Sequence, residues 1–255
     1  MTKPHKPVFQ ARLARDDTDL MAALRLRYDV FVRELGGDGP LVDHDAQVER
    51  DKFDPFYDHL VLVDETRRPG DHVVGAYRLM QADGAARAGQ FYCEDEYDLT
   101  ALRALDRKLL ELGRSCLHPD YRGGTAMFEL WGALARYVAA YEVEILFGVA
   151  SFHGTDIAAL AQALSLLHHR HLAPKNLRVT SRVFQPMDLM PEDQIDRPAA
   201  MRDTPALIKA YLRLGGCVGE GAYVDHAFNT TDVCLVMDTA QMNTRHQGIY
   251  TQGTA

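Results

Sequence analysis

Residues 111–151 read ELGRSCLHPDYRGGTAMFELWGALARYVAAYEVEILFGVAS, and this stretch decides the fold. Its hydrophobic pattern predicts a strand over Glu111–Leu117, an Arg-Gly-Gly turn, a helix over Ala126–Tyr141 and a nearly all-apolar strand over Ile145–Ser151. An all-apolar strand is typical of a sheet interior, where both faces are covered. We therefore expect a helix-covered sheet built around this strand, helix and strand unit.

The segments on either side continue the alternation of strands and helices. On the N-terminal side the pattern predicts an edge strand over 8–14, a helix from the Asp16 cap to about Leu35, a hairpin of 59–63 and 71–80, an irregular segment over 81–97 and a short helix over 99–110. On the C-terminal side it predicts helices over 156–171 and 204–214 and strands over 177–183, 218–224 and 233–237. Repeats and linkers are absent from the sequence. The prediction is one α/β (α+β) domain over 8–239, with a mixed, mostly antiparallel central sheet flanked by helices, and a flexible tail over 240–255.

The charge of the chain is unevenly distributed. It has 28 Lys and Arg against 36 Asp and Glu, a formal net charge of −8, which argues against nucleic acid as a partner because phosphate binding needs a cationic surplus. Residues 157–187 contain no acid at all, yet they carry four cations: Arg170, Lys175, Arg178 and Arg182. This segment is a candidate docking surface for an acidic partner, and the alternative is an ordinary solvated face.

The cysteine usage and the hydropathy indicate a compartment. The cysteines Cys93, Cys116, Cys217 and Cys234 form no CxxC pair, which favours reduced thiols in the cytosol. Neither a signal peptide nor an uninterrupted apolar run of about 20 residues occurs in the sequence. We expect a cytoplasmic protein, with peripheral contact to the cytoplasmic membrane as a further option.

Charged residues stand at several ordered positions of the first half of the chain. They are Arg27 four residues before Phe31, Asp51 three before Asp54, Arg78 at the end of the hairpin, and Glu111 three before Arg114. On a regular strand Glu111 and Arg114 would point to opposite faces. An inward-facing charge on an apolar strand needs a partner, because a lone buried charge is costly. These residues could form a functional site or only surface salt bridges.

This ordered set resembles the charged motif of the acyl-homoserine lactone synthases. The resemblance implies a GNAT-like acyltransferase fold and acyl carrier protein as the acyl donor. That family has a tryptophan shortly after the phenylalanine, near its S-adenosylmethionine site, whereas Gly36 and Gly37 stand here and the single tryptophan is Trp131. A methionine-derived acceptor is therefore disfavoured, and an autoinducer synthase becomes the alternative function.

Longer segments resemble the ornithine N-acyltransferases, also described as hemolysin-like proteins. They are ELGRSCLHPDYRGG, LFGVASFHGTD, LIKAYLRLGG and GAYVDHAFNTTDVCLVMD, within a resemblance that covers Leu13–Asp238. It implies transfer of a 3-hydroxyacyl group from the phosphopantetheine of acyl carrier protein to the α-amine of L-ornithine, giving lyso-ornithine lipid. No tightly bound cofactor is implied. A membrane-active hemolysin is the non-enzyme alternative, and it has no long amphipathic apolar segment to support it.

The reaction assigns tasks to particular residues. A thiol leaves readily from a thioester, but a protonated α-amine needs a base, and Glu111 is the candidate, acting through water with Arg114 beside it. Its alternative role is to hold an arginine in place. The substrate-binding candidates are Arg27, Phe31, Asp51, Asp54 and Arg78. Both signs of charge for ornithine could come from Arg27, Arg114, Asp51 and Asp54, or these four could form a closed salt-bridge network that only shapes the floor of the pocket.

The segment after the 111–117 strand is the candidate site for the phosphopantetheine donor. Its residues are Ser115, Cys116 and Leu117, whose backbone amides could bind the thioester carbonyl, and Arg122, Gly123 and Gly124, which precede a helix N-terminus. Thr125 and Met127 occupy two positions of the GNAT coenzyme A motif that call for Gly and a small residue, which favours a single phosphate and hence a carrier protein. An ordinary glycine turn is the alternative.

Two further expectations concern other ligands. His168, His169 and His171 do not place three ligands on one helix face and have no Cys or carboxylate near them in sequence, so we expect no metal site there. The acid-free segment is the proposed docking site for the acidic carrier protein, and an anionic membrane surface could use the same cations.

Overall fold

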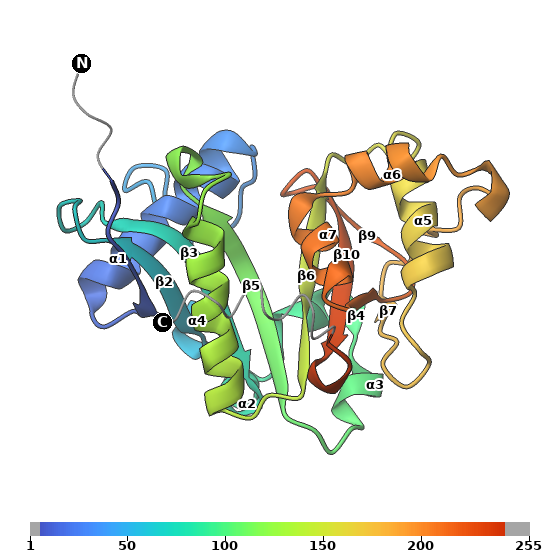
Figure 1. The fold of residues 1–255 in the computed structure, drawn as a ribbon, viewed down its shortest axis with the longest axis horizontal. Coiled ribbons are helices and arrows are strands. Elements are labelled where there is room, and N and C mark those ends of the chain that lie inside the picture. The colour runs from blue at the N-terminus through green and yellow to red at the C-terminus, as the bar shows by residue number, and fades with distance from the viewer. Residues whose placement is uncertain (1–5, 243–255) are drawn as a thin grey trace. The chain divides into compact units, whose positions relative to one another are not determined.

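The computed structural model describes residues 6–242, which form two compact units (Figure 1). The first unit comprises residues 6–79 and 113–141, and the second comprises residues 80–112 and 142–242. Strands β3 (Val73–Gln81) and β5 (Leu109–Leu117) contribute residues to both units.

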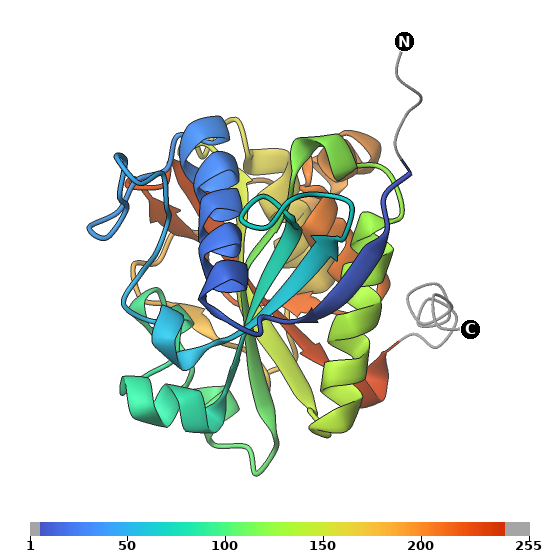
Figure 2. The same cartoon turned by 90° about the vertical axis from the view of Figure 1, so that its left-hand side faces the viewer.

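The first unit consists of antiparallel strands between two helices. Its elements are β1 (Phe9–Leu13), α1 (Asp17–Arg27), the π-helix η1 (Tyr28–Glu34), the 3-10 turn η2 (Asp54–Phe56), β2 (Asp58–Asp64), most of β3, the second part of β5, the 3-10 turn η4 (Pro119–Tyr121) and α4 (Ala126–Ala140). Strand β2 pairs antiparallel with β1 and with β3, so the edge strand and the hairpin predicted from sequence are confirmed. Helices α1 and α4 flank these strands (Figure 2).

Side-chain alternation along β2 explains why both helices are needed. Val61 and Val63 pack in a cluster with Ala22 and Leu26 of α1. Leu62 points the other way, because successive strand residues alternate between faces. Both faces of this strand are therefore apolar and covered by a helix. The close-packed interior holds the strand ends, and the charged residues near them, in fixed positions.

The first helix changes its geometry at Arg27. Asp16 caps its N-terminus by accepting a hydrogen bond from the Asp19 amide at 3.0 Å, as its sequence position predicts. The helical segment reaches Glu34, close to the predicted end at Leu35, but residues 28–34 form a π-helix and not a continuation of the α-helix. The sequence pattern did not predict this change. A π-helical turn is often associated with a functional site.

The second unit is built on the strands β5, β6 and β10. Its elements are α2 (Ala82–Ala88), η3 (Tyr92–Asp95), β4 (Tyr97–Asp98), α3 (Thr100–Arg103), the first part of β5, β6 (Ile145–His153), α5 (Ala161–His171), β7 (Thr180–Ser181), η5 (Glu192–Gln194), α6 (Arg197–Asp203), α7 (Ala206–Arg213), β8 (Cys217–Val218), β9 (Tyr223–Asp225), β10 (Thr230–Asp238) and η6 (Thr239–Gln241). Strand β6 pairs antiparallel with β10 and parallel with β5, and β10 pairs antiparallel with β8 and β9. The mixed, mostly antiparallel architecture is thus confirmed.

A glycine lets β5 and β6 approach closely. A Cβ atom built at Gly148 would lie 2.2 Å from the carbonyl oxygen of Leu112, a separation that no side chain tolerates. The pairing of these strands joins Leu109–Glu111 to Ile145–Phe147, so Gly148 directly follows the last paired residue of β6. Glycine at this position is a packing requirement of the second unit.

Several local predictions are wrong in this unit. Residues 81–97 are not irregular, because α2 and η3 lie there, and the helix expected over 99–110 is only the four-residue α3. The strand expected over 177–183 shrinks to Thr180–Ser181. In each case the segment is short and lacks clear periodicity, so tertiary contacts decided its conformation.

Two expectations concern membranes and the tail. Among residues 6–242, no helix is both long and apolar enough to cross a membrane. The predicted flexible tail begins at residue 240, and its first two residues belong to the 3-10 turn η6 (Thr239–Gln241), where Asp238 accepts a hydrogen bond from the Ala240 amide at 3.0 Å. Residues 243–255 lie outside the described part of the chain.

Candidate functional site

Three arginines and three carboxylates of the first unit form a closed ring of ion pairs, which we call the arginine-carboxylate ring. Its members are Arg27, Arg78, Arg114, Glu49, Asp51 and Asp54. Each arginine contacts two carboxylates, and each carboxylate contacts two arginines. The formal charges of the six side chains therefore balance.

The distances around the ring are those of direct ion pairs. Arg27 donates to Glu49 at 2.5 Å and to Asp54 at 2.6 and 3.2 Å. Arg78 reaches Asp54 at 2.9 Å and Asp51 at 2.7 Å. Arg114 completes the circuit to Asp51 at 3.3 Å and to Glu49 at 3.2 Å. The fork of a guanidinium suits this bridging, because its donors diverge in one plane.

The ring is buried, and its electrostatics differ from those of surface pairs. Arg27 and Arg78 are each 1% exposed, and Glu49 is 0% exposed. Burial alone would raise the pKa of Glu49, but Arg114 and Arg27 lower it to about 2. Arg27 and Arg78 likewise hold the pKa of Asp54 below its ordinary value against the effect of burial. These two carboxylates are charged at neutral pH and need their arginines.

The backbone at Arg114 adopts an unusual conformation. Its φ of 51° lies in the left-handed region, which is uncommon for a residue with a Cβ and costs about 1–3 kcal/mol. A left-handed residue interrupts side-chain alternation along β5. The expectation that Glu111 and Arg114 point to opposite faces assumed a regular strand, and the backbone at Arg114 is not regular. The guanidinium carbon of Arg114 lies 5.9 Å from the ring centre of Phe31, which is half-buried.

The ring brings together five of the charged residues singled out in the sequence and adds Glu49. No charge imbalance in the sequence pointed to Glu49, because Asp51, Asp54 and Glu111 already balanced the three arginines of the predicted set. Glu49 lies two residues before Asp51. The roles of these side chains in binding a substrate stay predictions.

Glu111 belongs to the second unit and contacts backbone amides there. Its carboxylate accepts hydrogen bonds from the amides of Tyr92 at 3.0 Å and Cys93 at 2.6 Å. These are the first two residues of the turn η3. The residue is 1% exposed. The two amides fix the orientation of this carboxylate. Its role as a base stays a prediction.

The candidate donor-binding residues lie at the end of β5 and before α4. Cys116 packs in the core beside α1, and burial raises the pKa of its thiol to about 12, which excludes a thiolate at neutral pH. Arg122 pairs with Glu34 at 2.6 and 2.7 Å and donates to the Leu117 carbonyl at 3.2 Å. Its guanidinium therefore has an acid partner, a contact that the sequence pattern did not indicate. Gly123 has a φ of 75°, and Ser115 and Gly124 stand beside these residues as predicted.

The acid-free segment gains acids from other parts of the second unit. Arg170 of α5 pairs with Glu192, and Arg178 lies 3.9 Å from Glu220. Sequence proximity does not show which acids fold against these cations, and the role of the segment as a docking surface stays a prediction. Arg182 and Lys175 complete the segment.

Three carboxylates of the second unit could hold a cation. One ligand atom each from Glu96, Asp225 and Asp232 lies within 4.8 Å of the others. The sequence pattern indicated none of the three. The histidines His168 and His169 instead stack edge to face, with ring centres 5.2 Å apart.

Comparisons with known proteins define the class. A family model described as an acetyltransferase (GNAT) domain matches residues 26–132. An N-acyl amino acid synthase from uncultured soil microbes is similar over 95% of this chain and 98% of its own, with a TM-score of 0.54 at 13% identity. A CoA-dependent acyl-homoserine lactone synthase is similar over 97% of this chain and 89% of its own, with a TM-score of 0.54 at 14% identity. The predicted GNAT-like fold is confirmed, and the chain is an N-acyltransferase of this class.

Sequence comparison narrows the class to a family. The chain is 62% identical over 96% of its length to the L-ornithine N(alpha)-acyltransferase of Rhodobacter capsulatus, of which it covers 95%. It is 39% identical over 94% of its length to the protein of the same name from Brucella abortus, of which it covers 88%. The chain belongs to the L-ornithine N(alpha)-acyltransferase family.

Proposed function

We propose that this enzyme transfers a 3-hydroxyacyl group from acyl carrier protein to the α-amine of L-ornithine and so makes lyso-ornithine lipid. The assignment of L-ornithine as the acceptor is supported by the 62% identity to the Rhodobacter capsulatus protein over nearly the whole of both chains. The donor and its 3-hydroxyl come from the resemblance of the motifs. The reaction joins the α-nitrogen to the acyl carbon, breaks the C–S bond and releases the phosphopantetheine thiol with the amine proton.

Glu111 is the proposed base, acting through a water molecule. The two backbone amides fix its carboxylate, and a water in contact with this carboxylate would take the proton from the α-ammonium. Replacing Glu111 by Gln keeps the shape of the side chain but removes the proton acceptor. We expect kcat to fall about 100-fold at pH 7. A folded Glu111→Gln variant with near wild-type kcat from pH 6 to pH 9 contradicts the assignment.

The arginine-carboxylate ring is proposed to shape the site and not to bind the ions of ornithine. Every side chain of the ring already has two partners of opposite charge. An ornithine carboxylate or ammonium would have to break these buried pairs, which costs several kcal/mol. Phe31 beside Arg114 is proposed to contact the substrate through its apolar ring.

The donor is proposed to bind through its phosphopantetheine arm. The backbone amides at Ser115, Cys116 and Leu117 are proposed for the thioester carbonyl. The Arg122-Gly123-Gly124 turn before α4 is proposed for the single phosphate through backbone amides, since the Arg122 guanidinium is paired with Glu34. This arm is attached to the carrier protein and is no tightly bound cofactor of the enzyme.

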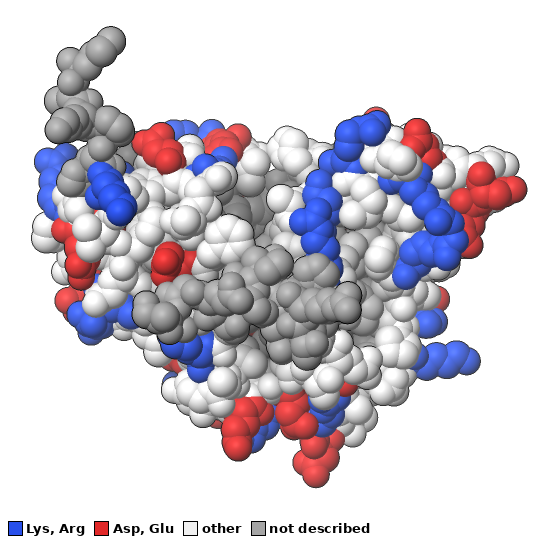
Figure 3. All heavy atoms as spheres, in the orientation of Figure 1, with Lys and Arg blue, Asp and Glu red and all other residues white. Residues whose placement is uncertain are grey.

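The carrier protein is proposed to dock on the cationic face of the second unit. Lys and Arg side chains gather over α5, α6 and α7 (Figure 3). They include Arg202 and Arg213, which are exposed and, within residues 6–242, have no carboxylate at ion-pair distance. The proposed surface combines these helices with the predicted cations Arg170, which lies on α5, and Lys175, Arg178 and Arg182. An acidic carrier protein would be steered to such a face.

Charge reversal tests the docking surface. The double variant Arg202→Glu, Arg213→Glu should raise the KM for the acyl carrier protein about tenfold at low salt, with a smaller effect at 0.5 M NaCl, because salt screens exposed charges. The matched control is Arg33→Glu, which changes an exposed arginine of the first unit that pairs with Asp29. An unchanged KM at low salt contradicts docking on this face.

One experiment tests the whole proposal. The purified chain is incubated with 3-hydroxyacyl carrier protein or the matching coenzyme A thioester, each with L-ornithine or S-adenosylmethionine, and the products are analysed by mass spectrometry. N-(3-hydroxyacyl)ornithine formed from the carrier protein is the expected product. An acyl-homoserine lactone formed in the parallel reaction would instead support the autoinducer synthase.

A further inference from the structure

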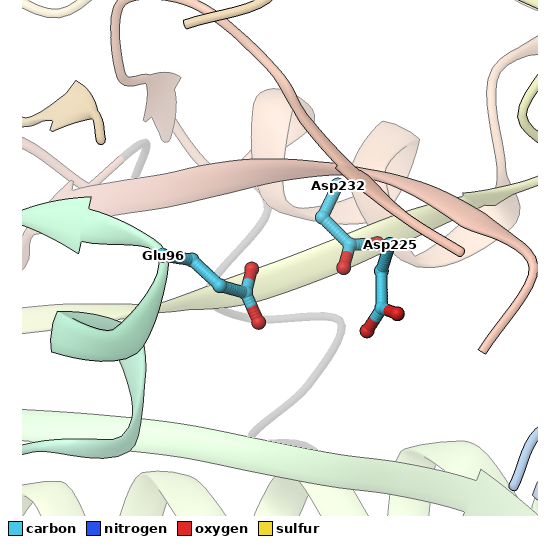
Figure 4. A group of neighbouring side chains, drawn as sticks. All are labelled: Glu96, Asp225 and Asp232. Carbon is cyan, nitrogen blue, oxygen red and sulfur yellow. The ribbon is translucent and has the colours of Figure 1, made fainter. Parts of the chain in front are cut away.

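Three carboxylates that the reaction chemistry above does not use meet in the second unit. Glu96 follows the turn η3, Asp225 ends β9 and Asp232 lies on β10, and all three side chains converge (Figure 4). One oxygen from each lies within 4.8 Å of the others. We call these residues the carboxylate cluster. Glu96 is 5% exposed and Asp232 is 3% exposed, so mutual repulsion occurs where water screens it weakly.

A buried hydroxyl group faces the same place. Thr230 is 9% exposed, and its Oγ1 atom is buried and has no hydrogen-bond partner within the described residues 6–242. Thr230 is two residues from Asp232 on β10, and it stands opposite Asp225 in the β9–β10 register. Residues two apart on a strand, and residues directly opposite on paired strands, share one face. The hydroxyl therefore adds a neutral acceptor to the cluster.

The surrounding contacts hold the cluster in place. The Tyr97 hydroxyl donates to the carbonyl oxygens of Asp232 at 2.9 Å and Gly221 at 3.1 Å, which ties β4 to β10. The Arg182 amide donates to the Glu96 carbonyl at 2.8 Å. Burial and then the charges of the three carboxylates raise the pKa of Tyr223, whose side chain shares their face of β9. Several separate segments thus converge on one acidic spot.

The turn η3 connects this spot to Glu111. Its first amides, from Tyr92 and Cys93, donate to the Glu111 carboxylate, and Glu96 caps its other end. A 3-10 segment rises about 2 Å per residue, so the four steps from Tyr92 to Glu96 span about 8 Å. The two nitrogens of ornithine are about 6 Å apart when its side chain is extended. One short turn therefore connects the proposed base with a group of anions over a length comparable to that of the amino acid.

We propose that Glu96, Asp225 and Asp232, with the Thr230 hydroxyl, form a subsite for the primary ammonium at the end of the acceptor's side chain. This inference rests on the proposed function, because it takes a diamino acid as the acceptor. A primary ammonium has three N–H donors. Acceptors at about 2.8 Å around it are about 4.6 Å apart in tetrahedral geometry, which agrees with the spacing of at most 4.8 Å in the cluster. The subsite would orient ornithine so that its α-amine, and not its δ-amine, is the reacting nitrogen.

The test compares L-ornithine with L-norvaline, which has the same carbon chain but no δ-ammonium. Acyl transfer from a 3-hydroxyacyl carrier protein is measured for both acceptors with the full chain. The wild type should prefer ornithine. Glu96→Gln and Asp232→Asn should each lower the ornithine to norvaline ratio of kcat/KM at least tenfold, mainly through a higher KM for ornithine. Asp98→Asn is the matched control, because Asp98 is exposed, lies two residues from Glu96 and caps Thr100.

Two results would overturn the subsite. One is an unchanged ornithine to norvaline ratio in both variants when each melts cooperatively. The other is tight Ca²⁺ or Mg²⁺ binding by the EDTA-dialysed wild type that Asp232→Asn abolishes without changing that ratio. In the second case the cluster is a metal site and not an ammonium site.

A separate measurement distinguishes this inference from the proposed function. If the wild type acylates no ornithine, the proposed function fails, whereas the ammonium site is still judged by its binding of n-butylammonium chloride. At equal ionic strength, this salt should raise the melting temperature of the wild type more than NaCl does, and Asp232→Asn should abolish the difference. Equal melting temperatures of the wild type in both salts contradict the ammonium site.

Discussion

The arginine-carboxylate ring of the first unit and the carboxylate cluster of the second unit each hold three carboxylates in largely buried surroundings, but they differ in charge balance. In the ring, three carboxylates face three arginines, and every member has two partners of opposite charge. In the cluster, one oxygen from each of three carboxylates lies within 4.8 Å of the others, and Asp225 also accepts hydrogen bonds from the Ala227 and Phe228 amides at 2.8 and 3.0 Å. The ring balances its charges, whereas the cluster gathers groups of like charge.

The charge balance of a buried group of side chains indicates whether the group stabilises the fold or binds a ligand. A buried ion pair is weak evidence of stability, but removing one partner leaves an uncompensated charge at a high cost. A group of like charges lowers the stability of the fold that holds it together. Such a loss of stability is typical of a binding site. We expect substitutions in the ring to destabilise the fold and substitutions in the cluster to change binding.

The largest effect is expected from removing an arginine of the ring. Arg78→Met keeps the apolar volume but leaves Asp51 and Asp54 each short of one partner. The free energy of unfolding should fall by about 3–5 kcal/mol, measured by urea denaturation at pH 7. Arg33→Met is the control, because its exposed pair with Asp29 should contribute less than about 0.5 kcal/mol. Equal losses in the two variants would show that the ring is no more important than a surface pair.

These two regions also differ in how far the sequence predicts them. Arg27, Asp51, Asp54 and Arg78 could be grouped because charges at ordered positions beside apolar segments demand partners. Glu49 was missed because Glu111 already balanced the third arginine of the predicted set. The left-handed Arg114 could not be predicted, since no local pattern marks a non-glycine residue with positive φ.

The carboxylate cluster could not be found in the sequence at all. Glu96 and Asp232 are far apart along the chain, and Asp225 reaches them only through the β9–β10 register. The sequence predicted continuous strands over 218–224 and 233–237, which assigns Asp225 to neither strand. The same limit affected Arg170 and Arg178, whose acid partners Glu192 and Glu220 lie outside the acid-free segment. Patterning predicts elements, but the pairing of distant elements decides which charges meet.

A smaller change in the free energy of unfolding is expected when the pH is lowered, because the ring holds Glu49 ionised. Glu49 has a pKa of about 2 in the folded chain against an ordinary value of 4.5, so its ionised form contributes stability above about pH 4.5 that is lost as the pH falls toward 2. The difference corresponds to about 3 kcal/mol. Burial also lowers the pKa of His59, so protonation of this histidine in the unfolded chain adds a loss below its ordinary pKa of 6.5. Urea denaturation at pH 3, 5 and 7 measures both.

Glu49→Gln separates the contribution of the ring from that of other groups. The variant should be less stable than the wild type at pH 7 but should lose less stability between pH 5 and pH 3, since Gln does not titrate. Asp29→Asn serves as the control, because its carboxylate belongs to an exposed pair. An identical pH dependence in the wild type and Glu49→Gln would mean that the ring does not hold Glu49 ionised in acid.

The smallest effect has the opposite sign and concerns the carboxylate cluster. Glu96→Gln removes one of three like charges, so the free energy of unfolding without acceptor should rise by about 1 kcal/mol at pH 7. Urea denaturation is measured in EDTA, so that a bound divalent ion does not stabilise the wild type. Adding ornithine should stabilise the wild type more than the variant, because ligand that binds the native state shifts unfolding by mass action. A loss of more than 1 kcal/mol without ligand would instead mean that the fold itself balances the cluster, as it balances the ring. The contrast in sign between Glu49→Gln and Glu96→Gln therefore decides whether the two regions are built for different purposes.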